Sequence, residues 1–204
     1  MIIIGLTGSI GMGKSTVSLQ FALLGAKVAN ADDFVHQLME KSEVIVEIAE
    51  IFPSAIIDKK IDRKILGQIV FADEKKRKIL EKIIHPQVVE LEEKFIKQQQ
   101  KLGAKLVVLD IPLLFETGAE KRVDYSVVVT APAFIQRQRV LKRQNMTQKK
   151  FEAIVASQMT DYEKRLRADF IISTGLGKAD SFKCIKSIIK TNLGMYKHID
   201  CPNC

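Results

Sequence analysis

The sequence has no tryptophan and only three cysteines among its 204 residues. Three cysteines cannot build the disulfide framework of a small secreted domain, so a reducing, cytoplasmic setting is expected. Aromatic residues make up 6% of the chain, which leaves little material for platforms that stack nucleic-acid bases. No apolar run approaches membrane-spanning length, and the apolar N-terminus lacks the charged region of a signal peptide. We therefore expect no membrane partner.

The charge balance is basic. Lysine and arginine number 32 against 24 aspartates and glutamates, which gives a formal net charge of +8. Such an excess indicates an anionic partner, either nucleic acid, a membrane surface or a phosphorylated metabolite. The charges are spread in clusters such as residues 75–78 and 149–150, which is more typical of solvated helix faces than of a nucleic-acid groove. With few aromatic residues as well, we expect no nucleic acid among the partners.

Short β-branched runs alternate with helical stretches, the pattern of an α/β protein with a parallel sheet. The expected strands are residues 2–6, 27–29, 105–109, 125–129 and 170–173. A helix is expected from Lys14 to about Leu24, with Gly25 as its stop.

One long stretch, residues 33–102, is predicted to be wholly helical. Asp62 and Asp73 are expected to be N-caps within it. Pro86 is expected in a first helical turn, with His85 beside it at the helix start. A crossover between parallel strands needs far fewer residues, so this stretch is predicted to be an inserted lobe that holds a second substrate.

A second insertion, residues 143–165, is polar and charged, with Thr147 as a cap. It could be a mobile cover over the site or an ordinary surface hairpin. The chain is expected to form a single domain with a core of residues 1–32, 103–142 and 166–193, a lobe of residues 33–102, a lid of residues 143–165 and a tail of residues 194–204. The tail offers His198, Cys201 and Cys204 at metal-ligand spacing, but a structural zinc site normally has four ligands, so a frayed terminus is favoured.

The segment from Gly8 to Ser15 fits the phosphate-binding pattern G-x-x-x-x-G-K-S/T. Its glycines allow successive backbone N–H groups to turn toward phosphate oxygens, and the following helix adds its positive end. Lys14 is expected to reach the β- and γ-phosphates, and the Ser15 hydroxyl to bind Mg²⁺. The predicted nucleotide-binding residues are Gly11, Met12, Gly13, Lys14, Ser15 and Thr16. ATP and Mg²⁺ are the expected co-substrate and cofactor.

Acidic residues follow two of the predicted strands. Asp110 ends an apolar strand, as an acid that acts on magnesium does, although it could instead be a capping residue. Asp32 and Asp33 follow the second strand, and the carboxyl ends of parallel strands line the ligand crevice. A carboxylate there could accept the proton of an attacking hydroxyl. Alternatively, both acids cap the next helix, and Asp33 is the expected cap if only one of them does so.

Arginines are the other requirement, because planar donors can bind charge that spreads over transferring oxygens. Arg137, Arg139 and Arg143 are predicted to lie on one helix, with the last two on a shared face. Arg165 and Arg167 follow on the returning side of the cover. A solvated basic helix is an equal alternative for any one of them.

Six segments resemble dephospho-CoA kinases in order and spacing, and they cover nearly the whole chain. These are GLTGSIGMGKSTV, ADDF, LEKIIHPQV, LDIPLLFE, QRQRVLKR and ADFIISTG. The resemblance implies a three-layer P-loop fold with a five-stranded parallel sheet, a helical substrate lobe and a helical lid. It also implies transfer of the ATP γ-phosphate to the ribose 3′-hydroxyl of dephospho-CoA, the last step of coenzyme A synthesis.

The same resemblance assigns roles to residues. Asp32 corresponds to the general base, and Asp32, Lys14, Arg139 and Arg143 form the expected catalytic set. The acceptor site is expected to include Asp32, His85, Pro86, Leu113 and Glu116, and the metal site Ser15 and Asp110. We expect a monomer or a weak homo-oligomer.

The chain departs from the family pattern at two positions. Asn30 stands where the family has the first acid of D-A-D, so the role of base depends on Asp32 alone. Thr174 stands where the family usually has an asparagine before glycine, which would loosen base selectivity or leave it to backbone groups if that side chain holds adenine.

Three alternatives stay open. Another P-loop small-molecule kinase, such as a nucleoside monophosphate or shikimate kinase, would explain the loop and lid but not HPQV together with DIPLLFE. A nucleotide-binding switch would normally carry N-K-x-D to read guanine, and that pattern does not occur here. A nucleic-acid-dependent ATPase is motivated by the net charge alone.

Overall fold

The computed structural model describes residues 1–192, so the predicted metal-like residues of the tail, His198, Cys201 and Cys204, lie outside the described residues. The chain divides into two compact units. One comprises residues 1–29 together with the described chain from Gln99, and the other comprises Asn30–Gln98. Across residues 1–192, no helix combines the length and the apolar character needed to cross a membrane.

The first unit is built on a five-stranded sheet with the order β2-β5-β1-β6-β7. Its strands are β1 (Ile2–Thr7), β2 (Lys27–Asn30), β5 (Leu106–Asp110), β6 (Tyr125–Thr130) and β7 (Phe170–Ser173). The pairs β1–β5, β1–β6 and β6–β7 run parallel, and Ile4 of the central strand pairs with Val108 and Tyr125. All five predicted strands are confirmed, with small differences at their ends.

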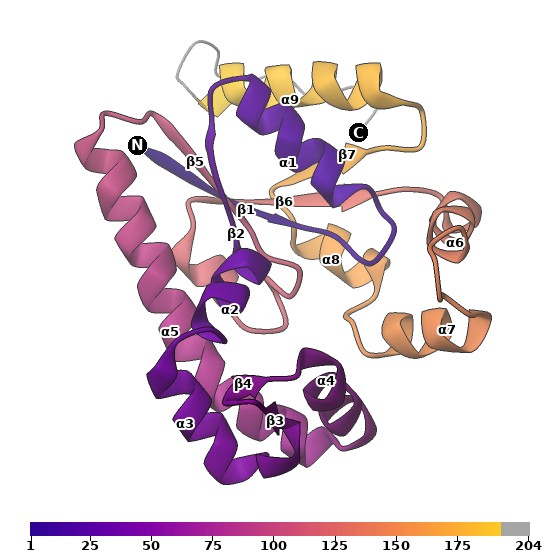
Figure 1. The fold of residues 1–204 in the computed structure, drawn as a ribbon. Helices are drawn as coiled ribbons and strands as arrows, with labels where there is room; N and C mark the ends of the chain where they lie inside the picture. Colours follow the sequence, from indigo (N-terminus) through magenta and orange to yellow (C-terminus); the bar gives the residue numbers. More distant parts are fainter. Residues whose placement is uncertain (193–204) are drawn as a thin grey trace. The chain divides into compact units, whose positions relative to one another are not determined.

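The strands are apolar on both faces because helices cover a parallel sheet on both sides. In the first unit, α1 (Lys14–Leu23) packs against α9 (Lys178–Asn192), as Figure 1 shows. Phe21 of α1 and Ile185 of α9 are fully buried in the same core cluster as Leu6 and Val127. This packing fixes the helix that follows the glycine-rich loop against the sheet.

The remaining elements of this unit are shorter. They are η2 (Ala119–Arg122), α6 (Ala133–Leu141), α7 (Gln148–Ala156) and α8 (Asp161–Arg167). The predicted cap of α7 is confirmed, since Thr147 accepts a hydrogen bond from the Lys150 N–H. Thr160 and Glu163 form a capping box at the start of α8, and the hydrogen bonds from the Thr160 hydroxyl and backbone N–H lower the pKa of Glu163.

The second unit has its own core and is mostly helical. It contains α2 (Ala31–Leu38), α3 (Ser42–Ile51), η1 (Pro53–Ala55), β3 (Ile56–Ile57), β4 (Lys60–Ile61), α4 (Arg63–Ala72) and most of α5 (Glu74–Lys101). Its buried cluster includes Leu38, Ile48, Leu66 and Ile84. The prediction of a wholly helical stretch is wrong at β3 and β4, which form a small antiparallel hairpin.

The hairpin turns at Asp58 and Lys59, which have φ of 49° and 61°. Positive φ at both central residues is the requirement of a type I′ turn, which normally uses asparagine or glycine. The pair Asp58-Lys59 carries a weak signal for such a turn, and this explains why the sequence pattern did not predict it.

Helix caps in this unit were predicted with mixed success. Asp62 accepts hydrogen bonds from two N–H groups of α4, and Asp73 accepts two from the start of α5, so both predicted caps are confirmed. The cap of α2 is Asn30, whose side chain accepts the Asp32 N–H at 3.0 Å. The prediction that Asp33 is the cap is therefore wrong, because Asn30 already occupies the extended residue before the first turn.

Pro86 does not begin a helix. It lies inside α5, and His85 lies beside it on the same continuous helix, with both residues exposed. The helix starts twelve residues earlier because Asp73 caps it there. An interior proline removes one backbone hydrogen bond, and the Gln87 side chain donates to the nearby Ile83 carbonyl at 3.3 Å.

Replacing Asp62 with alanine should lower the free energy of unfolding by about 1 kcal/mol, because two N–H groups at the start of α4 lose their acceptor. Chemical denaturation of the full chain measures the effect. Gln68→Ala, at an exposed position of the same helix, is the control and should change stability by less than about 0.5 kcal/mol. Equal stability of the two variants would contradict the capping role.

Candidate active site

The glycine-rich loop between β1 and α1 has a backbone conformation that residues with a side chain rarely adopt. Gly11 and Gly13 have φ of 79° and 95°, in the left-handed region that favours glycine. A Cβ at Gly11 would lie 2.4 Å from Cγ2 of Val140, so the loop also passes too close to α6 for any larger residue. Gly13 is the N-cap of α1, which directs the first N–H groups of that helix outward as an anion-binding end.

Lys14 and Asp110 lie close together, because Lys14 follows β1, Asp110 ends β5, and these two strands pair. The Lys14 ammonium donates a hydrogen bond to the Asp110 carboxylate and forms an ion pair with it. Their side chains are 16% and 5% exposed. The loop lysine and the strand-end acid therefore share one small region beside the first turn of α1.

This region suits a magnesium ion that is bound together with phosphates. Ser15 is exposed in the first turn of α1, and Asp110 supplies a carboxylate beside Lys14. Among the described residues, no group of three or more His, Cys, Asp or Glu side chains could hold a metal ion by itself. Mg²⁺ is usually bound by one or two protein oxygens with water and substrate phosphates, so these two oxygen donors fit it.

Side chains from distant segments hold the loop at Met12. The Thr174 hydroxyl, just after β7, donates to the Met12 carbonyl at 2.7 Å and is buried. Arg139 of α6 donates to the Thr174 hydroxyl at 2.8 Å and to the Thr174 carbonyl at 2.9 Å. Thr174, a departure from the family pattern, is thus placed to support the loop. The sequence analysis did not predict that role.

A second pair of side chains holds the loop at Ile10. Gln136 of α6 donates to the Ile10 carbonyl at 2.9 Å, and Gln158 accepts the Ile10 N–H at 3.1 Å. The two glutamines were not singled out from the sequence. Gln136 begins the segment QRQRVLKR, but that pattern does not indicate a contact with Ile10. Gln158 lies 148 residues from Ile10 along the chain, so no local pattern could have revealed its contact.

The predicted arginine arrangement is wrong in one respect. Helix α6 ends at Leu141, so Arg143 lies beyond its end and shares no helical face with Arg139. The backbone N–H of Arg143 closes the turn onto Val140. Its side chain is exposed and has no hydrogen-bond or ion-pair partner within residues 1–192.

The other arginines of this region bind protein groups. Arg137 donates to Gln148, Arg165 pairs with Asp161, and Arg167 pairs with Glu120. The Arg167 guanidinium also lies 4.8 Å from the centre of the Phe115 ring. Among these five arginines, Arg143 is therefore the one whose side chain has no protein partner in the described part of the chain.

An ion pair between a buried lysine and a partly exposed glutamate joins α8 to the segment that follows β5. Lys164 is fully buried, and its ammonium lies 2.9 Å from one carboxylate oxygen of Glu116 and 3.2 Å from the Pro112 carbonyl. The same Glu116 oxygen accepts the Met159 N–H at 2.9 Å. Glu116, predicted to bind substrate, therefore has its carboxylate engaged in the protein, next to the partly buried Leu113.

The remaining predicted site residues belong to the second unit. Asp32 is in the first turn of α2 and is exposed, and its carboxylate has no hydrogen-bond or ion-pair partner among residues 1–192. His85 and Pro86 lie on the exposed side of α5. The expectation that His85 lies at a helix start is wrong, because α5 is continuous through it.

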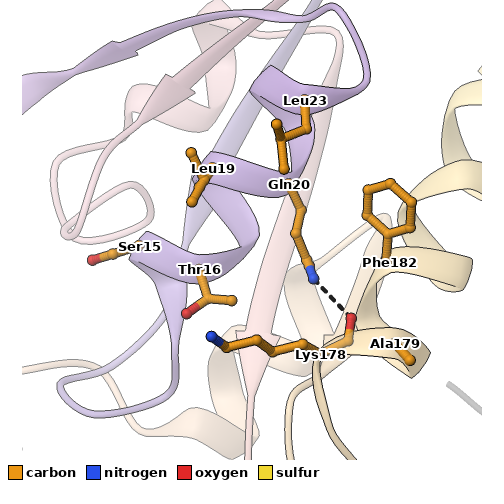
Figure 2. A pocket seen from close by; sticks show the side chains of 8 residues that line it. All are labelled: Ser15, Thr16, Leu19, Gln20, Leu23, Lys178, Ala179 and Phe182. Carbon is orange, nitrogen blue, oxygen red and sulfur yellow. Dashed lines mark hydrogen bonds between the residues drawn. The ribbon is translucent and has the colours of Figure 1, made fainter.

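An open groove of about 480 Å³ lies between α1 and α9 (Figure 2). Ser15, Thr16 and Leu19 line it from α1, and Lys178 and Phe182 from α9. The Gln20 amide donates to the Lys178 carbonyl at 2.7 Å and joins the two helices there. The two hydroxyls predicted to serve phosphate and metal thus lie at the wall of a largely apolar groove.

The strand, the glycine loop, the helix end and the paired lysine and acid define a P-loop nucleotide-binding protein of the small-kinase type. A shikimate kinase from Acinetobacter baumannii has the same fold, with 17% identity, a TM-score of 0.52, and 97% and 96% of the two chains covered.

A family model and more similar relatives identify the family within this class. A family model described as dephospho-CoA kinase matches residues 2–179, and the chain belongs to that family. A dephospho-CoA kinase from Bartonella henselae is 49% identical over 193 residues, covering 95% of this chain and 99% of the relative. The structure of a dephospho-CoA kinase from Campylobacter jejuni is 32% identical, with a TM-score of 0.70 and 95% and 98% of the two chains covered.

Replacing Lys164 with alanine should lower the free energy of unfolding by about 3 kcal/mol, because the fully buried Lys164 side chain would leave a cavity and the Glu116 carboxylate would lose its charged partner. Urea denaturation of the full chain measures this, with the exposed Lys149→Ala of α7 as the matched control. The double variant Lys164→Met, Glu116→Leu should recover part of the loss, since methionine refills the buried volume of Lys164 and no unpaired charge remains. A loss under about 1 kcal/mol in Lys164→Ala would contradict this account.

Proposed function

We propose that the chain transfers the γ-phosphate of ATP to the 3′-hydroxyl of the ribose of dephospho-CoA, giving coenzyme A and ADP, the last step of coenzyme A biosynthesis. The observation that carries the proposal is the membership of the dephospho-CoA kinase family over residues 2–179, together with a P-loop whose lysine lies on Asp110. A cytoplasmic location remains part of this proposal.

The P-loop would bind the triphosphate of ATP. Gly11, Met12, Gly13, Lys14, Ser15 and Thr16 would surround the phosphates. The N–H groups of Gly11, Gly13, Lys14 and Ser15 would be the donors, since those of Met12 and Thr16 already donate to the Ser9 and Gly13 carbonyls. The rigid backbone supports this role, since donors that are already oriented need no rearrangement when charge arrives. Lys14 would exchange part of its contact with Asp110 for the β- and γ-phosphate oxygens.

Ser15 and Asp110 would hold Mg²⁺, Asp110 directly or through water. Bound there, the ion would supply positive charge that neutralises the negative charge developing on the phosphates. The protein residues themselves would orient the phosphate chain. Two oxygen ligands and a nearby lysine support this assignment.

Asp32 would accept the proton of the attacking ribose hydroxyl. The support is chemical: an exposed carboxylate without a protein partner, two residues after the end of β2, is free to bind a hydroxyl. Asn30 cannot take this role and instead caps α2 beneath Asp32. Its amide oxygen holds the Asp32 backbone, which orients the acid without adding a second charge.

The acceptor would be bound with the help of Asp32, His85, Pro86, Leu113 and Glu116. Glu116 would act by holding the segment around Leu113 in place through Lys164, because its carboxylate is already engaged. Arg143 would contact the moving phosphoryl group, since its guanidinium is unpaired in the described chain, while Arg139 would act by fixing the loop through Thr174. Residues 143–165 would close over the site and exclude water.

The experiment that tests the function is a substrate panel with purified protein, ATP and Mg²⁺. Dephospho-CoA should be converted to coenzyme A, detected by mass spectrometry, whereas nucleoside monophosphates and shikimate should not be phosphorylated. Phosphorylation of one of those acceptors and not of dephospho-CoA would overturn the proposal in favour of a different P-loop kinase.

Replacing Asp32 with asparagine should lower kcat by about 10²- to 10⁴-fold, because the hydroxyl proton would lose its acceptor. The affinity for ATP should stay close to that of the wild type, since the change is at the acceptor. Asp33→Asn, the neighbouring exposed acid on the same helix turn, is the matched control and should keep most of the activity. A wild-type turnover number in Asp32→Asn would show that another group is the base.

A further inference from the structure

Gln158 follows α7 and lies in the segment between β6 and β7, far from the P-loop in sequence. Its side-chain oxygen accepts the N–H of Ile10 at 3.1 Å. Ile10 lies in the first half of the loop, and its carbonyl is held on the other side by the Gln136 amide at 2.9 Å. One peptide of the loop is thus held between two glutamine side chains.

The orientation of the Gln158 amide follows from its partner. Because the Ile10 N–H can only donate, the group that faces it is the Gln158 oxygen. The Gln158 NH₂ group therefore points away from Ile10. It has two hydrogens to donate, and no partner for them is found within residues 1–192.

The backbone around Gln158 is well anchored. The next N–H along the chain, that of Met159, donates to Glu116, and Glu116 is fixed by the buried Lys164. The Thr160–Glu163 capping box then begins α8. Gln158 is thus presented to the loop from a fixed backbone, with one hydrogen-bonding group used and the other available.

The position of Ile10 in the loop indicates which phosphate this free amide would meet. The N–H groups at the start of α1 surround the α- and β-phosphates, and Lys14 reaches the β- and γ-phosphates. The earlier part of the loop, where Ile10 lies, is therefore left beside the terminal phosphate. A neutral donor there can bind a γ-phosphate oxygen without adding charge.

We infer that Gln158 is a γ-phosphate-binding residue: its oxygen holds the Ile10 peptide, and its NH₂ group donates to a terminal phosphate oxygen of ATP. By this contact residues 143–165 distinguish ATP from ADP, because ADP has no phosphate at that place. The inference rests on the proposed function for the ATP site. Under this inference Gln158 contacts the nucleotide. In a purely structural role it would only hold the Ile10 peptide in place.

The test is calorimetric titration of the full chain with MgATP and with MgADP. In Gln158→Glu the carboxylate can still accept the Ile10 N–H, but it loses the donor and places a negative charge beside the γ-phosphate. The affinity for ATP should fall about tenfold more than the affinity for ADP, since the repulsion acts on one ligand only. Gln144→Glu, an exposed glutamine of the same segment, adds the same charge as a control and should leave the ratio of the two affinities unchanged.

Equal losses of affinity for ATP and ADP in Gln158→Glu, or no loss for either, would overturn the inference. Gln158 would then only hold the Ile10 peptide in place. If Gln158→Glu does not fold, Gln158→Met removes the donor without adding a charge. It also removes the acceptor for the Ile10 N–H, and the expected result is a threefold or greater selective loss of ATP affinity, about the value of one hydrogen bond. A wild-type protein that binds neither nucleotide would instead refute the proposed function, so the two failures are distinguishable.

Discussion

The rigid backbone of the P-loop is the constraint on which the rest of the site depends. Gly11 has a positive φ and passes within contact distance of Val140, and the carbonyls of Ile10 and Met12 are each held by a side chain from another segment. These contacts fix the donors before any nucleotide arrives. Binding then loses less conformational entropy, and the same donors remain aligned as charge develops on the phosphates.

The contacts that hold the loop also connect it to parts of the chain that approach from other directions. Helix α6 and the residue after β7 hold Met12, while α6 and the segment after α7 hold Ile10. The Lys164–Glu116 pair fixes the end of that last segment onto the chain that follows Asp110. The loop, the strand-end acid and the proposed lid are therefore linked by specific polar contacts, several of them buried.

Local features of the sequence predicted much of this structure. The P-loop, the five strands and the caps Asp62, Asp73 and Thr147 each depend on residues that are close in sequence, so their patterns were sufficient. Pro86 was misplaced because its own preference for a helix start competes with a cap twelve residues earlier, and the position of the cap determines the start.

Long-range polar contacts could not be predicted in this way. Gln136, Gln158 and Thr174 meet the P-loop only after the sheet has brought their segments together. The motifs around Gln136 and Thr174 do not indicate these contacts, and no motif includes Gln158. Lys164 is a similar case: in sequence it belongs to a basic, polar helix, yet it is completely buried on Glu116. The role of each of these side chains depends on the group that it contacts, and that group is distant in sequence.

The most direct test of the mechanism is a crystal structure of the protein with Mg²⁺, a non-hydrolysable ATP analogue and dephospho-CoA. The account predicts that the γ-phosphate lies against the P-loop and that the Asp32 carboxylate lies about 2.6–3.2 Å from the ribose 3′-hydroxyl, directly or through one water. A carboxylate directed elsewhere, with a different side chain within reach of that hydroxyl, would contradict it.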